Sequence, residues 1–247
     1  MKNRKIYIKV TSFIIIMSCL YFYFLFINKE SNREHNIKFF GICLCFLFSF
    51  IIKKDKFDTW LVRMALLFTV ISDWLLVIEG KYYIAALITF TFTQIFYAIR
   101  IWFNEPKKNK NTEHIIIRII LIVFFILIIR FLVGIELDLL LIITVIYFSN
   151  LLINLILSAI NIRKNFIFPI GLLLFILCDI MVGLNNISDY IDINEASFFN
   201  SLINNAAFIA WVFYFPSQAI LALSIITNKI HTDVWIFVLI YLIYNKL

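Results

Sequence analysis

The sequence predicts an all-α membrane protein with about eight transmembrane helices, on three observations. Of the 247 residues, 63% are apolar and only 15% are charged, whereas a soluble domain is about a quarter charged. The mean hydropathy is +0.97. The apolar residues form long runs without a period of two, so helices are the form in which they would cross a bilayer. This composition excludes a soluble globule, a disordered chain and a nucleic-acid-binding domain.

Eight apolar runs approach or exceed the length of about 20 residues that a transmembrane helix needs. The first run is too long for a secretory signal and no small-residue cleavage site follows it, so we predict an uncleaved helix. The second run is short and is predicted to be tilted or partly interfacial. A further apolar segment, 234–244, is about half the required length and is predicted to lie in the membrane interface. The eight predicted helices, within a single membrane domain 1–247, are 6–27, 39–52, 60–78, 82–103, 115–133, 137–160, 166–187 and 202–227.

The basic residues predict the orientation, because cytoplasmic loops carry an excess of Lys and Arg. Most of the 22 basic residues fall at the N-terminus and in every second loop after it. We therefore predict that both termini are cytoplasmic, which agrees with an even number of helices. The net charge of +7 is interpreted as loop charge, and the expected setting is the lipid bilayer of the cell membrane.

Two acidic residues, Asp73 and Asp179, stand inside predicted helices, where a carboxylate costs about 2.5 to 3.5 kcal/mol or more. Segments 66–76 and 172–182 align without gaps at an offset of 106 residues and pair the two aspartates. This suggests a four-helix unit used twice, with both carboxyl groups at one depth. Intramembrane acids mark functional sites by default, so we predict that Asp73 and Asp179 are catalytic. The alternative is a protonated acid bonded to a neighbouring side chain.

Polar and aromatic side chains in the later helices complete the candidate site. Trp211, Tyr214 and Gln218 share a helix face by their spacing of three and four residues. Such side chains also serve simply as hydrogen-bond links between helices. Arg118, near a helix end, is predicted to extend to the cytoplasmic interface. The candidate substrate-binding residues are Gln94, Tyr97, Tyr147, Asn150, Trp211, Tyr214 and Gln218.

The types of residue that are missing from the apolar runs narrow the chemistry. The three histidines lie in loops or just outside helices, and the four cysteines show no Cys-x-x-Cys spacing. There is no glycine-rich phosphate loop and no dinucleotide fingerprint. We therefore expect no metal and no cofactor, and a reaction carried by carboxyl, phenol and amide groups.

These motifs resemble those of the YhhN-like lysoplasmalogenase family of eight-helix membrane proteins, over residues 65–224. This chain has Ser72 where the family usually has Gly, Gln94 where it usually has His, and Cys178 where it often has Ser. The matching pieces are Ser72-Asp73 with Leu75-Leu76, Gly80, Gln94-x-x-Tyr97, Cys178-Asp179, and Trp211-x-x-Tyr214-x-x-x-Gln218 with Ser224.

The resemblance implies hydrolysis of the vinyl ether bond of lysoplasmalogens, which releases a fatty aldehyde and a glycerophospho-base. Its substrate would be a lysophospholipid of the lysoplasmalogen type. That chemistry needs a proton on the carbon β to the ether oxygen and water on the resulting oxocarbenium ion. One carboxyl can donate the proton while the other activates the water.

Two other classes of protein use paired intramembrane acids. A proton-coupled transporter is the first alternative, although its helices would more often be broken by Gly and Pro. An intramembrane aspartyl protease is the second, but neither aspartate here follows a Gly-x-Gly segment. With the resemblance taken into account, we rank the hydrolase first, the transporter second and the protease third.

Overall fold

The computed structural model describes residues 2–26, 32–52, 57–104, 111–133, 138–160, 165–186 and 198–226. Eight of its helices are long and apolar enough to cross a membrane, which confirms the predicted fold class. The segments η1 and η3 are π-helical, and η5 is a 3₁₀ turn. The elements are α1 (Lys2–Phe26), α2 (Asn32–Ile51), α3 (Phe57–Asp73), η1 (Trp74–Glu79), α4 (Tyr83–Phe103), α5 (Asn111–Leu127), η3 (Ile128–Val133), α6 (Leu139–Ile160), α7 (Ile167–Asn186), α8 (Phe198–Leu223) and η5 (Ser224–Ile226).

The second helix differs from its prediction. It begins at Asn32 rather than at residue 39 and has 20 residues, so the expectation of a short helix was wrong. Its first turns are polar in sequence, but Glu34 and Lys38 are spaced by four residues and form an ion pair of 2.5 Å that favours the helical form. The predicted interfacial segment 234–244 lies outside the described residues.

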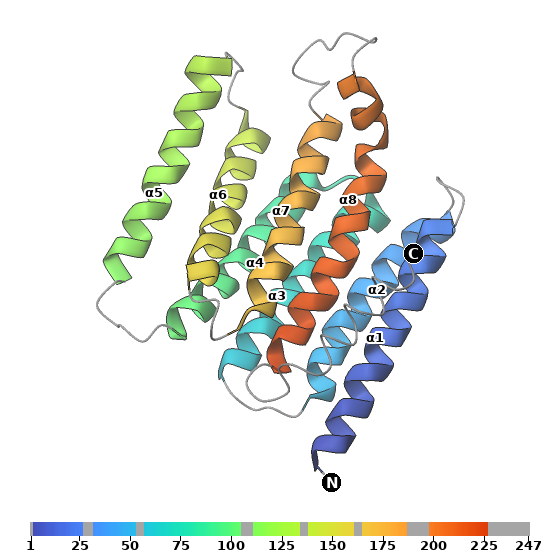
Figure 1. The fold of residues 1–247 in the computed structure, drawn as a ribbon. Coiled ribbons are helices and arrows are strands. Elements are labelled where there is room, and N and C mark those ends of the chain that lie inside the picture. The colour runs from blue at the N-terminus through green and yellow to red at the C-terminus, as the bar shows by residue number, and fades with distance from the viewer. Residues whose placement is uncertain are drawn as a thin grey trace.

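The helices form one bundle with α5 at one edge and α1 at the other (Figure 1). In the interior, α3 packs beside α4 and α7 beside α8. The second helix of the first half, α2, packs against α8, the last helix of the second half. Correspondingly, α6 packs against α4. In each half, therefore, the second helix contacts the fourth helix of the other half.

Close packing around α8 depends on small and special residues. A Cβ atom at Gly41 would collide with the ring of Phe215, so the glycine lets α2 approach α8. Pro216 has no N–H group, so the carbonyl of Val212, four residues earlier, loses its helical partner. The hydroxyl of Tyr21 in α1 donates to that carbonyl at 3.3 Å, which satisfies it inside the apolar bundle.

Candidate active site

Asp73 is the last residue of α3 and is only 2% exposed. The hydroxyl of Tyr214 in α8 donates a hydrogen bond of 2.8 Å to its Oδ2 atom. Beyond Asp73 the chain continues as the π-helical segment η1, a form that recurs at functional sites. The segment ends at Gly80, whose φ of 63° is left-handed and whose N–H bonds back to Leu75.

Asp179 lies in α7 and has the same kind of partner. The hydroxyl of Tyr147 in α6 donates a hydrogen bond of 2.7 Å to its Oδ2 atom. Tyr147 is buried, whereas Asp179 is half-buried. Each aspartate in the bundle is therefore bonded to one tyrosine, and Asp179 is the more accessible of the two.

The two aspartate–tyrosine pairs meet around one aromatic cluster. The ring of Phe175 in α7 lies 6.4 Å from that of Tyr147 and 5.4 Å from that of Tyr214, between centroids. Phe90 in α4 lies 5.7 and 6.4 Å from the same two tyrosines. Trp211 packs edge-on against Tyr214 at 5.1 Å. Both carboxyl groups thus border the same largely apolar interior.

A chain of polar contacts leads from α5 into this interior. Arg118 donates to the Oδ1 atoms of Asn150 and Asn154, each at 2.7 Å. Asn154 in turn donates to the backbone oxygen of Gln94 at 2.8 Å and to its Oε1 at 3.1 Å. The sequence analysis predicted that Arg118 extends to the interface and did not foresee that two asparagines of α6 bind its guanidinium. Asn150 contacts Arg118 rather than an aspartate.

Three polar side chains of α4 and α8 have hydrogen-bonding atoms without partners among the described residues. They are the Nε2 of Gln94, the hydroxyl of Tyr97 and both amide atoms of Gln218, and all three residues are fully buried. Gln94 and Gln218 follow Phe90 and Tyr214 by four residues, so each lies one turn further along the same helix face. Buried polar atoms of this kind nearly always bind something.

Hydroxyl groups align α3 with α4. Ser72 and Thr89 share a hydrogen bond of 2.6 Å, and Thr69 and Thr93 share one of 3.3 Å. These contacts hold the turn that carries Asp73. The sequence analysis missed them, although the spacing of three residues in one helix and four in the other was a readable signal.

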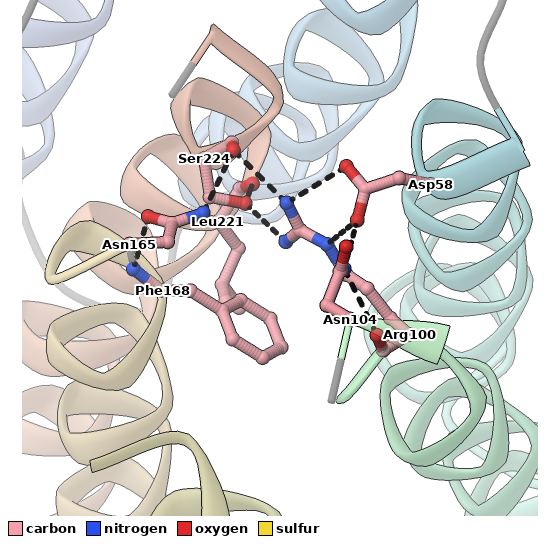
Figure 2. Close-up of polar contacts among 7 residues, drawn as sticks. All are labelled: Asp58, Arg100, Asn104, Asn165, Phe168, Leu221 and Ser224. Atoms are coloured by element: carbon pink, nitrogen blue, oxygen red, sulfur yellow. Dashed lines mark hydrogen bonds and ion pairs between the residues drawn. The ribbon is translucent and has the colours of Figure 1, made fainter. Parts of the chain in front are cut away.

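At one end of the bundle, the buried guanidinium of Arg100 forms the centre of a polar cluster, which Figure 2 shows. It donates to the two carboxylate oxygens of Asp58 at 2.9 and 3.3 Å, and to the hydroxyl and backbone oxygens of Ser224 at 2.6 and 2.9 Å. Asn165 also donates to the Ser224 carbonyl, at 3.1 Å. Arg100 therefore ties together the ends of α3, α4, α7 and α8, at what we name the Arg100 end.

The sequence model of the YhhN family matches residues 33–225, and this range includes every candidate site residue described above. Within the described residues, no three His, Cys, Asp or Glu side chains are grouped to hold a metal ion. No curated protein and no solved structure matches the chain. Because the family match covers most of the 247 residues, the chain belongs to the YhhN family.

Proposed function

We propose that this protein hydrolyses the vinyl ether bond of lysoplasmalogens, with Asp73 and Asp179 as its acid and base. The observation that carries the proposal is the pair of intramembrane carboxyl groups, each bonded to a tyrosine, around one aromatic cluster. Membership of the YhhN family supports it. The apolar side chains around the two aspartates suit an alkenyl chain. Within the apolar part of the described helices, no other acidic side chain is available to that chain.

The reaction consumes one water molecule and no net proton, because the proton given to carbon is recovered in the later steps. One carboxyl group donates its proton to the carbon β to the ether oxygen, which gives an oxocarbenium ion. The other carboxylate takes a proton from water as the water oxygen bonds to the cationic carbon, giving a hemiacetal. As the bond from the hemiacetal carbon to the glycerol oxygen breaks, the carboxyl group that took the proton from water gives it to the leaving oxygen, and the other carboxylate takes the proton of the hemiacetal hydroxyl. The alcohol and the fatty aldehyde are released, and both carboxyl groups return to their starting states.

The unpartnered polar atoms beside the site suit the hydrolytic water. A buried water needs two to four polar partners. Gln218 offers a donor and an acceptor, Gln94 a donor, and Tyr97 a hydroxyl, all one turn or two from the aromatic cluster. The contact from Asn154 occupies the Oε1 of Gln94 and leaves its Nε2 for this role.

The experiment is aldehyde release from a panel of lysophospholipids by the purified full chain, followed by mass spectrometry. Asp73→Asn and Asp179→Asn keep side-chain size but remove the transferable proton, so each should reduce kcat by about 10² to 10⁴. Because the two groups act as a unit, the double variant should be scarcely slower than either single one. Asp138→Asn is the matched control, since Asp138 is exposed and caps α6, where Asn serves equally.

Near-normal turnover by a folded Asp73→Asn or Asp179→Asn protein would reduce that residue to a structural role. Proton-coupled transport is the second candidate. The packing of α2 against α8 and of α6 against α4, across the two halves, favours it. It predicts proton flux in liposomes and no aldehyde from any lipid. The hydrolase predicts aldehyde from detergent-solubilised protein, where no gradient exists.

A further inference from the structure

Lys38 is a cation buried inside the bundle, outside the groups assigned to the reaction above. Its side chain is 9% exposed, although lysine in a membrane helix usually extends to the interface. The Nζ atom lies 4.8 Å from the ring centroid of Trp211 in α8 and 5.6 Å from that of Phe24 in α1. Keeping a charge at such a place is costly, so its presence calls for a reason.

The ammonium group has hydrogen-bonding capacity to spare. Lysine carries three N–H donors. In the described part of the chain, the carboxylate of Glu34 is its one acceptor, at 2.5 Å. Two aromatic faces occupy other sides of the ammonium, and these contacts attract a cation without accepting a conventional hydrogen bond. An anion at this place would therefore find donors ready.

Lys38 is connected to the candidate active site by direct contacts. Trp211, which lies against Lys38, packs at 5.1 Å on Tyr214, and Tyr214 is bonded to Asp73. Trp211 precedes Tyr214 by three residues, so it lies about one turn further from the Arg100 end. Asp179 lies seven residues before Asn186, the last residue of α7, and is therefore about 10 Å from the end of α7 that is opposite the Arg100 end. The cation thus lies against the turn of α8 that follows Tyr214 in the direction away from the Arg100 end.

On the proposed function, we infer that Lys38 and Glu34 bind the zwitterionic head group of the lysophospholipid. In such a lipid, only the glycerol carbons and one oxygen separate the ether oxygen from phosphorus. The phosphate therefore stands only a few bonds from the vinyl ether, and Lys38 is connected to Asp73 through the contacts of Trp211 and Tyr214. The Glu34 carboxylate suits the positive group of the head by ion pairing. Opposite charges in the pair match opposite charges in the ligand.

The test measures binding without chemistry, on the purified full chain in nanodiscs. The probes are a saturated 1-O-alkyl lysophospholipid carrying phosphoethanolamine, the same lipid with a bare phosphate, and 1-O-alkylglycerol. Lys38→Met should weaken binding of both phosphate lipids by about 10- to 100-fold, as expected for lost hydrogen bonds to a charged group, and leave alkylglycerol unchanged. Glu34→Gln should weaken only the phosphoethanolamine lipid, and Lys38→Arg should keep most of the affinity. Lys81→Met, which removes an exposed cation, is the control and should change nothing.

A second variant covers the case in which Lys38→Met leaves Glu34 as an unpaired charge and fails to fold. Glu34→Gln with Lys38→Met removes both charges, so it avoids that penalty. A folded variant of either kind that still prefers the phosphate lipids over alkylglycerol to the wild-type extent overturns the inference. Absence of aldehyde release by wild-type protein would overturn the proposed function alone, because the binding preference is measured separately.

Discussion

Replacing Tyr214 by Phe removes one hydroxyl from the candidate active site and leaves its ring. That hydroxyl gives the one hydrogen bond that Asp73 accepts from the described residues, at 2.8 Å. The ring would keep its contacts with Phe175, Phe90 and Trp211. The perturbation is therefore confined to the partner of one carboxyl group.

The magnitude follows from the burial of Asp73, which is 2% exposed, so water cannot readily replace the lost donor. A hydrogen bond to a charged group contributes about 1.5 to 3 kcal/mol, which corresponds to about 10- to 150-fold in kcat if the carboxyl depends on it. Tyr147→Phe makes the same change beside Asp179. We expect a loss of the same order, because Tyr147 gives the one hydrogen bond that Asp179 accepts from the described residues.

The assay is the initial rate of aldehyde release against substrate concentration, with melting temperature in detergent as the measure of folding. Tyr83→Phe is the matched control, because this tyrosine of α4 is 56% exposed and should give wild-type values. A folded Tyr214→Phe protein with kcat within twofold of wild type would refute the role given to this hydrogen bond. Equal losses in Tyr214→Phe and Tyr83→Phe would show that phenol removal acts through something other than Asp73.

Three further predictions concern stability, cofactor and topology. Arg100→Gln breaks the buried cluster with Asp58 and Ser224, so it should lower the free energy of unfolding by about 3 kcal/mol. Denaturation in detergent measures this effect, and an unchanged midpoint would contradict it. Chelators should leave turnover unchanged, whereas stoichiometric zinc whose removal abolishes activity would contradict the two-aspartate mechanism. Reporters fused within 188–200, which lies largely outside the described residues, should report an external loop, and a cytoplasmic signal would overturn the orientation.

The fold was predictable because each span is a long apolar run, and the physics of the bilayer leaves such runs few alternatives. The two aspartates were identifiable for a related reason, since a charge within an apolar run is conspicuous. The pairing of Tyr147 with Asp179 was not predictable, because it depends on how α6 and α7 are rotated about their axes. That rotation is set by packing among many side chains rather than by a local pattern.

The same distinction explains why the start of α2 was predicted too late and why the partners of Arg118 were not foreseen. Glu34 and Lys38 show the spacing of a helical ion pair, but a hydropathy reading begins the helix after them, at residue 39. Arg118 lies in a segment with no buried residue, so the sequence of its own helix indicated only contacts with lipid and with the membrane interface. Its partners Asn150 and Asn154 lie on α6, and only the packing of α5 against α6 reveals them.

The predicted repeat places the two aspartates at equivalent positions, but their surroundings are not equivalent. Asp73 takes its tyrosine from α8, in the other half of the chain, whereas Asp179 takes its tyrosine from α6, in its own half. As whole residues, Asp73 is 2% exposed and Asp179 is half-buried. The proposed acid–base reaction needs one carboxyl group to hold a proton when the other does not, and repulsion between two carboxylates that share a site favours that state even where the sites are identical. The unequal tyrosine partners add a fixed difference between the two groups, so we expect the shared proton to reside preferentially on one of them.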